Sequence, residues 1–160
     1  MINLDEIKLV VYDFDDTLCI HEKHSDSEDE EHLYNITVLK EGSKAYSGST
    51  NIQMKWFIDK CTKLGIRQGL ISATRSYKHA SAKCDWVSEN YGVSLEDFCV
   101  GNPRDKIEML CSIKDAYNLE EYEILLVDDY WQNLEDAANK GFSCCTPMEI
   151  VNLWNKGFSH

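Results

Sequence analysis

Three carboxylates fall within four positions directly after an apolar run, in the stretch 13–18, which reads DFDDTL. The run before it, Leu9 to Tyr12, is typical of a strand that is buried in a parallel sheet. Carboxylates at the end of such a strand lie where open α/β sheets bind ligands. Because like charges repel and burying them unpaired is costly, a divalent cation is their simplest compensation. This stretch therefore predicts metal-assisted chemistry.

Strand-like apolar runs alternate with helix-like segments along the rest of the chain. The predicted strands are residues 8–13, 66–72, 97–100, 124–127 and 142–145. The predicted helices are residues 51–64, 76–91, 105–117, 133–140 and 148–155. Residues 35–39 are predicted as one arm of a small hairpin, and residues 43–50 as a loop. This alternation predicts an α/β fold with a mainly parallel sheet and helices on both faces.

The length of 160 residues fits one compact domain with a substantial core. We therefore predict a single domain over residues 1–160, in which residues 19–50 form a small flap or loop insertion. No apolar run approaches the roughly 20 residues of a membrane span, and no secretory signal is visible. The seven cysteines are odd in number and scattered, which is typical of reduced thiols. We expect a cytoplasmic protein without a membrane partner.

The net charge of −12 is unevenly distributed along the chain. Residues 1–50 carry 4 basic and 12 acidic side chains, residues 51–106 carry 9 and 6, and residues 107–160 carry 3 and 10. The negative net charge of the chain argues against generic nucleic-acid binding. Only the middle segment is suited to an anionic substrate, although its basic residues, Lys83 among them, are more simply interpreted as a solvated helix face. The acidic run 26–31 is interpreted as a solvated loop, with a docking or metal-binding segment as the alternative.

Polar and charged side chains follow several of the predicted strands. Because the carboxyl ends of parallel strands meet at one edge of a sheet, residues far apart in sequence converge there. Each of these side chains alone could have an ordinary structural role, such as a helix cap or a surface charge. Their combination is hard to explain by structural roles alone. These residues are Asp13, Asp15, Asp16, Thr17, Ser72, Thr74, Lys106, Asp128 and Asp129.

The carboxylates among them suit phosphoryl chemistry. Asp13 and Asp15 are alternate residues, so their side chains can share one cavity. One carboxylate can attack phosphorus to form an aspartyl-phosphate, while the other protonates the leaving oxygen and later activates water. Asp129, supported by Asp128, can complete a magnesium site. The cofactor that the sequence predicts is therefore Mg²⁺.

Two further side chains are candidates for contact with the phosphoryl group. The hydroxyl of Ser72 can donate a hydrogen bond to a phosphoryl oxygen, and Lys106 can place a positive charge against the developing negative charge.

These motifs resemble those of the haloacid dehalogenase (HAD) superfamily, and there the phosphatases. The first motif, two aspartates one residue apart followed by x-Thr-Leu, matches residues 13–18. The second, a Ser or Thr that ends an apolar strand, matches Ser72, and the third, a lysine near a helix start, matches Lys106. The fourth, an apolar strand that ends in two acids, matches residues 124–129. The resemblance spans about residues 8–145 and implies a Rossmann-like doubly wound fold, magnesium dependence and a phosphoaspartate intermediate.

The resemblance also assigns roles to individual residues. It implies Asp13 as the nucleophile and Asp15 as the general acid–base. It implies that magnesium is held by Asp13, the main-chain carbonyl of Asp15, and Asp129 with Asp128 beside it. The expected substrate-binding residues are Thr17, Ser72, Ala73, Thr74, Arg75 and Lys106.

The spacing between the motifs leaves no room for a large cap domain. There are 32 residues between Leu18 and Asn51, and 33 between Ser72 and Lys106. The chain is therefore similar to the capless magnesium-dependent phosphatase group. Its sequence at residues 72–75, SATR, differs from the usual Ser-Arg-Thr of that group, because the arginine is displaced.

Other functions stay open beside this one. A receiver domain needs a phosphorylatable aspartate on its third strand, for which the sequence offers no good match. A catalytically silent interaction module using residues 20–50 and a phosphoryl-transfer enzyme acting on nucleic-acid ends are the alternatives. The predicted function is a magnesium-dependent phosphomonoesterase, a hydrolase whose substrate is a small-molecule or macromolecular phosphate.

Overall fold

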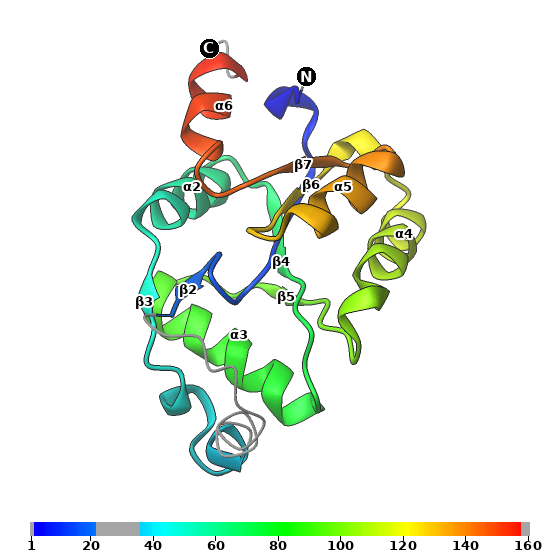
Figure 1. Ribbon diagram of the computed structural model, residues 1–160. Helices are drawn as coiled ribbons and strands as arrows, with labels where there is room; N and C mark the ends of the chain where they lie inside the picture. Colours follow the sequence, from blue (N-terminus) through cyan, green and yellow to red (C-terminus); the bar gives the residue numbers. More distant parts are fainter. Residues whose placement is uncertain (1, 22–35, 158–160) are drawn as a thin grey trace.

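Five parallel strands form the central sheet in the computed structural model, which describes residues 2–21 and 36–157 (Figure 1). The strands are β1 (Leu9–Tyr12), β4 (Arg67–Leu70), β5 (Glu96–Asp97), β6 (Ile124–Val127) and β7 (Ser143–Cys145). Their order is β5-β4-β1-β6-β7, and each neighbouring pair is parallel. After β1, the chain first adds β4 and β5 on one side of this strand, and then adds β6 and β7 on the other side. The predicted α/β fold with a mainly parallel sheet is confirmed.

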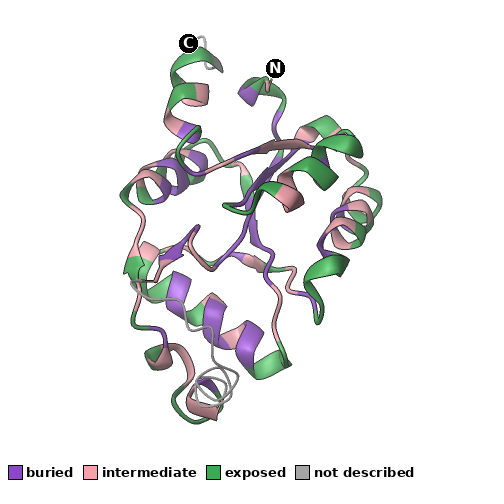
Figure 2. Cartoon of the chain, in the orientation of Figure 1, coloured by how far each residue is buried: buried purple, intermediate pink, exposed green. Residues whose placement is uncertain are grey.

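Alternation along β1 divides the core into two layers, one on each face of the sheet. Val10 and Tyr12 pack in one layer with α2, α3 and α6, whereas Leu9 and Val11 pack in the other with α4 and α5. The helices are α2 (Ile52–Lys63), α3 (Tyr77–Tyr91), α4 (Lys106–Tyr117), α5 (Trp131–Asn139) and α6 (Ile150–Gly157). Figure 2 shows the buried strands running between helices whose outer faces are exposed. Helices therefore cover both faces of the sheet, as predicted.

Local signals account for most helix ends. The side chain of Asn51 accepts a hydrogen bond from the backbone N–H of Gln53 and so caps α2. Gly92 ends α3 in the left-handed conformation, with φ of 68°. The predicted bounds differ from the structure by a few residues at several ends. For example, α5 begins at Trp131 rather than at residue 133, α6 begins at Ile150 rather than at residue 148, and β5 covers Glu96–Asp97 rather than residues 97–100. Such shifts of a few residues are typical where no strong capping signal is present.

The segment that follows the first motif departs from prediction. Residues 36–39, expected in a hairpin arm, belong to a helix over residues 36–41, so that expectation was wrong. Only Val38 of this stretch is fully buried, and a short apolar run does not distinguish a helix from a strand. An antiparallel pair forms instead between β2 (Cys19–Ile20) and β3 (Ser49–Thr50), with a 3-10 turn, η2 (Gly42–Ala45), before β3. The acidic run 26–31 lies outside the described residues.

The cysteines fit the expectation of reduced thiols. All seven are free; Cys19, Cys61 and Cys145 are buried and the other four are partly buried. Burial raises the pKa of the Cys19 and Cys61 thiols to about 12, which keeps them in the unreactive thiol form. Within the part of the chain that the structure describes, no helix is long and apolar enough to cross a membrane.

Gly69 in β4 gives the ring of Phe98 its place on the sheet. A Cβ atom at residue 69 would overlap the edge of that ring. We expect Gly69→Ala to lower the free energy of unfolding by about 1–3 kcal/mol, because the ring must shift within a packed layer. Urea unfolding measures this. Gly101→Ala is the control, since its added Cβ meets no atom within 4 Å; equal losses in the two variants would contradict the prediction.

Candidate active site

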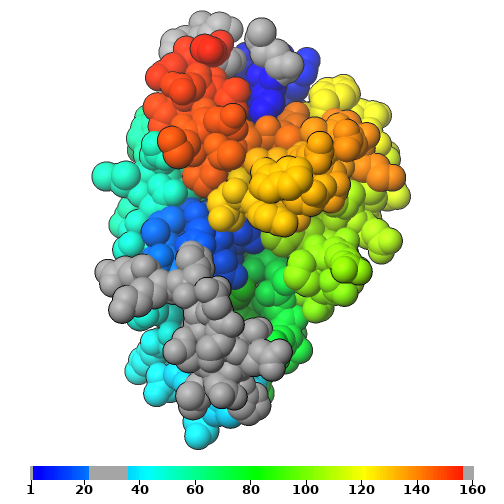
Figure 3. All heavy atoms as spheres, viewed as in Figure 1, coloured from blue at the N-terminus to red at the C-terminus, as the bar shows by residue number. Residues whose placement is uncertain are grey.

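The carboxyl ends of β1, β4 and β6 bring the predicted site residues to one edge of the sheet. Tyr12, the last residue of β1, pairs with the last residue of each neighbouring strand, so the three strands end level. Asp13 follows β1, Ser72 lies two residues after β4, and Asp128 and Asp129 follow β6. In Figure 3 the blue atoms of the segment after β1 reach the surface between α5 and the green atoms of α3. The edge of the sheet that carries these residues thus lies close to the protein surface.

Lys106, at the start of α4, joins two of the carboxylates. Its Nζ lies 2.7 Å from Oδ1 of Asp13 and 3.2 Å from Oδ2 of Asp128. All three side chains are buried. Burial raises the pKa of Asp13 to about 7, although the positive charge of Lys106 acts against this rise. Burial lowers the pKa of Lys106, but the two carboxylates more than offset it, so the lysine is charged.

Asp128 and Asp129 differ sharply in their surroundings. Asp128 is fully buried and accepts hydrogen bonds from the backbone N–H of Tyr130 and from Nδ2 of Asn133, each at 2.9 Å. Asp129 is exposed, and its Oδ1 lies 3.5 Å from the hydroxyl of Thr17. The hydrogen bonds of Asp128 therefore stabilise the turn that leads into α5, while the exposed carboxylate of Asp129 has oxygen atoms available to a ligand.

Oxygen atoms of Asp13, Asp128 and Asp129 lie within 4.8 Å of one another. This cluster is an oxygen-only donor set at a partly open position, which is the kind of ligand set that Mg²⁺ prefers. Four carboxyl groups lie at this edge, with Asp15 included, so acidic groups outnumber the two ammonium groups of Lys83 and Lys106. A divalent cation would offset that excess, so the residues present fit magnesium in the chemistry of their oxygen atoms.

Asp15 lies between the side chains of Lys83 and His21. Its Oδ2 is 2.9 Å from Nζ of Lys83, and its Oδ1 is 2.9 Å from Nε2 of His21. Burial raises the pKa of Asp15, but the hydrogen bond from His21 and the charge of Lys83 outweigh this and hold it well below its usual value. The hydrogen bond with Asp15 in turn raises the pKa of His21. The Asp15 side chain is still 49% exposed, so a ligand can reach its carboxylate.

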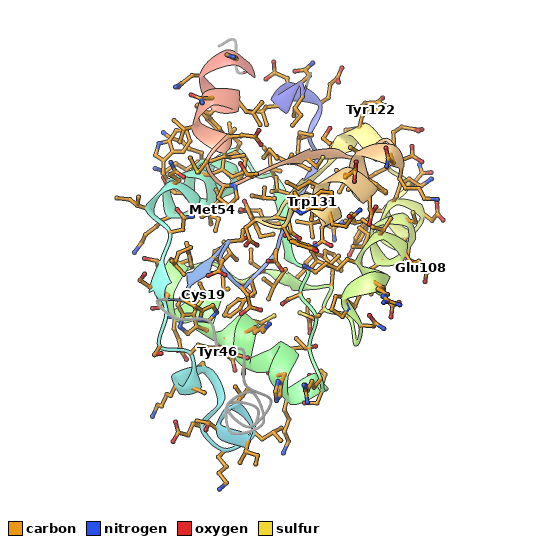
Figure 4. All side chains as sticks on the ribbon, viewed as in Figure 1. Cys19, Tyr46, Met54, Glu108, Tyr122 and Trp131 are labelled. Carbon is orange, nitrogen blue, oxygen red and sulfur yellow. The ribbon has the colours of Figure 1, made fainter. Side chains whose placement is uncertain are left out.

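Phe14 separates the two catalytic candidates by pointing into the core. Its ring is fully buried and packs edge-on against Tyr46 at 5.0 Å and Trp86 at 5.5 Å between ring centroids. Figure 4 shows Tyr46 between the η2 turn and α3. Asp16 then takes the left-handed conformation with φ of 59°, which turns the chain toward β2. Phe14 thus packs away from the site, as the alternation of side chains along an extended chain predicts.

The residues after β4 divide between the site and a hollow beside it. Ser72 is buried, and its Oγ lies 2.8 Å from Nζ of Lys83. The carbonyl oxygen of Ala73 is 3.4 Å from the same Nζ. Thr74 and the exposed Arg75 instead line a hollow of about 310 Å³, to which none of the four clustered carboxylates contributes. Of the six residues expected to bind substrate, Thr17 contacts Asp129, and Thr74 and Arg75 lie at the side of the site.

Sequence reasoning missed two site residues, Lys83 and His21. Lys83 was grouped with a solvated helix face, yet only 5% of it is exposed. A signal for its burial was present, because Ala80 and Val87, three residues before and four residues after it, are both apolar and share its helix face. For His21 no spacing pattern gave a comparable signal, since its contact with Asp15 depends on the turn at Asp16.

No family model and no curated protein sequence matches the chain. Solved structures do match it. Cobalt-bound deoxy-D-mannose-octulosonate 8-phosphate phosphatase (YrbI) from Haemophilus influenzae has a TM-score of 0.56 and 15% identity, over 93% of this chain and 75% of that one. The 3-deoxy-D-manno-octulosonate 8-phosphate phosphatase from Moraxella catarrhalis, in complex with magnesium, phosphate and a KDO molecule, has a TM-score of 0.51 and 18% identity, over 82% and 63%.

A Legionella pneumophila protein assigned to HAD superfamily subfamily III A is also similar, with a TM-score of 0.52 and 17% identity, over 83% of this chain and 60% of that one. The chain thus spans less than two thirds of the length of the Moraxella and Legionella proteins. Likeness at this level of identity concerns the arrangement of strands and helices. The chain therefore has the fold that these phosphatases and the HAD superfamily protein share.

Proposed function

We propose that this protein is a magnesium-dependent phosphomonoesterase that acts through an aspartyl-phosphate on Asp13. The observation that carries the proposal is the contact of Asp13 with Lys106 beside the oxygen cluster of Asp128 and Asp129. A carboxylate held next to a cation at the edge of a parallel sheet is placed to attack an anionic group that binds there. Support also comes from the similar Moraxella enzyme, whose complex contains magnesium and phosphate ions.

The first half of the reaction forms the covalent intermediate. A carboxylate oxygen of Asp13 attacks phosphorus, and the bond between phosphorus and the ester oxygen breaks. The contacts of Asp15 keep its pKa low in the free site, but the negative charge of a phosphoryl group bound beside it would raise that pKa. The protonated Asp15 then gives its proton to the ester oxygen, so that the substrate leaves as an alcohol. The half-exposed position of Asp15 suits this role, because the leaving group must be able to depart into solvent.

The second half releases phosphate. The Asp15 carboxylate takes a proton from water as the water oxygen attacks phosphorus, and the bond to Asp13 breaks. Inorganic phosphate and the original Asp13 carboxylate are formed, and Asp15 is again protonated for the next cycle. The contacts with Lys83 and His21 favour the ionised form of Asp15, which is the form that this half of the reaction needs.

The other side chains hold and neutralise the phosphoryl group. Lys106 lies next to Asp13 and would place its charge near the phosphoryl oxygens, while Ser72 would donate a hydrogen bond to one of them. Asp13, Asp129 and the carbonyl of Asp15 would hold magnesium, with Asp128 beside them. When bound, the metal would neutralise negative charge on the phosphoryl group and help to orient it.

Magnesium dependence tests the proposal directly. We expect the protein to hydrolyse p-nitrophenyl phosphate in the presence of Mg²⁺ and to lose that activity in excess EDTA. Asp129→Asn should weaken magnesium binding at least about 100-fold, because even partners outside the ligand shell change metal affinity 10–100-fold. Calorimetric titration with Mg²⁺ measures this.

The control is Asp136→Asn, which removes an exposed carboxylate from α5, where it accepts a hydrogen bond from Gln132. It should bind magnesium and turn over substrate like the wild type. Hydrolysis that persists unchanged in EDTA, or equal magnesium affinity in the wild type and Asp129→Asn, would overturn the proposed metal site. Absence of turnover on any phosphomonoester would overturn the enzyme function itself.

A further inference from the structure

We propose that Lys83 is a positioning residue that holds Asp15 and Ser72 in place for hydrolysis of the phosphoenzyme. The inference rests on the proposed function and adds to it a residue of α3, a helix to which the four motifs assign no role. It also assigns different roles to Lys83 and Lys106. Lys106 contacts the nucleophile, whereas Lys83 contacts the acid–base residue.

The ammonium group of Lys83 is fully engaged by the site. It has three N–H bonds, and three oxygen atoms surround it. These are Oδ2 of Asp15 at 2.9 Å, Oγ of Ser72 at 2.8 Å and the carbonyl oxygen of Ala73 at 3.4 Å. A side chain tethered at three points has little freedom, so it fixes the Asp15 carboxylate relative to Ser72.

The surroundings of Lys83 reinforce this placement. The residue is only 5% exposed, and its Nζ lies 4.9 Å from the centroid of the Phe14 ring. A lysine at such a position is costly for the fold unless a partner balances its charge. Asp15 is that partner, and its other oxygen is held by His21. The Asp15 carboxylate is thus held by one contact at each oxygen, and one of these contacts comes from helix α3.

This geometry suits the step in which Asp15 accepts a proton. A general base must point at the water that it activates, and small misplacements reduce its contribution steeply. Lys83 restricts the orientation of the Asp15 carboxylate, while its bond to Ser72 keeps that hydroxyl beside the carboxylate. Release of a good leaving group needs little help from a proton donor, so loss of Lys83 should affect mainly the second half of the reaction.

The test uses Lys83→Met with p-nitrophenyl phosphate, whose leaving group departs readily. We expect kcat to fall about 10–100-fold, within the range that acid–base groups contribute, while kcat/KM changes less than about 3-fold. Rapid-quench experiments should then show a burst of p-nitrophenol close to one per protein, because the phosphoenzyme accumulates. Lys83→Gln, which keeps a hydrogen-bond donor but loses the charge, should show the same burst with a smaller loss of kcat.

The matched control is Lys78→Met, which makes the same change at an exposed residue of the same helix. Its kcat should stay within about 2-fold of the wild type. A merely structural role for Lys83 would lower the burst amplitude and kcat together, since both would report the folded fraction. That result in both Lys83 variants, or wild-type kcat in both, would overturn the inference. A wild type without turnover or phosphoenzyme would instead overturn the proposed function.

Discussion

Asp13→Asn is expected to reduce magnesium-dependent phosphomonoester hydrolysis by at least about 1,000-fold, because losing a nucleophile removes the covalent pathway. The amide is almost the same size as the carboxylate and can still accept a hydrogen bond from Lys106, so the fold should survive. The measurement is kcat/KM on p-nitrophenyl phosphate, together with acid-quench detection of phosphorylated protein. The variant should form no phosphoenzyme.

Asp16→Asn provides the control within the same stretch of sequence. Asp16 has a φ of 59°, a conformation that asparagine adopts readily, and its Oδ1 accepts the backbone N–H of His21 at 3.2 Å. Asparagine can keep both features, so activity should stay within about 3-fold of the wild type. Full activity in Asp13→Asn, or equal losses in the two variants, would contradict the assignment of the nucleophile.

The convergence of the motifs could be predicted because it depends on a general property of parallel sheets. Apolar runs identified β1 and β6, and each ends directly at its carboxylates. Once the strands are parallel and adjacent, Asp13 and Asp128 must meet at one edge. Lys106 was placed correctly at a helix start, and its burial between those carboxylates is what the structure adds.

The environment of Asp15 could not be predicted in the same way. Its partner Lys83 lies 68 residues away on α3, and the contact depends on how that helix packs against the sheet. A lysine on a helix is usually exposed, so its residue type argued against burial even though its apolar neighbours argued for it. His21 reaches Asp15 across the turn at Asp16, where the chain takes the left-handed conformation. The helix over residues 36–41 was missed for a related reason, since one buried side chain, Val38, defines no period.

Lys83 and Lys106 together explain how four acidic side chains can lie at one edge of a folded protein. Each lysine contacts a different catalytic candidate, so the positive charge is spread across the site rather than concentrated at one point. The stability of the fold should therefore depend on these two contacts. Buried carboxylates that have lost their cation are strongly destabilising, and the effect should be largest where both partners are buried.

Lys106→Met should therefore lower the free energy of unfolding of the metal-free protein by about 3–5 kcal/mol, which is the usual consequence of breaking a buried ion pair. The substitution removes the cation shared by Asp13 and Asp128, whose side chains are 9% and 1% exposed. For a chain of this size the melting temperature should fall by roughly 10 °C. The control is Lys114→Met, because Lys114 is on the same helix but is partly exposed and pairs with acidic side chains near the surface. This substitution should lower the free energy of unfolding by no more than about 1 kcal/mol.

The pH dependence of this loss distinguishes an electrostatic cause from poor packing. The pKa of Asp13 is already raised to about 7 in the folded protein, above its ordinary value of 3.8, and removing Lys106 raises it further. A carboxyl group whose pKa is raised by folding favours the folded state when protonated, and that advantage is lost as pH rises toward the folded pKa. The difference between Lys106→Met and the wild type should hence be larger at pH 8 than at pH 5.5. Thermal unfolding at both pH values measures it, and a loss that is equal at the two would show that lost packing, rather than uncompensated carboxylates, destabilises the variant.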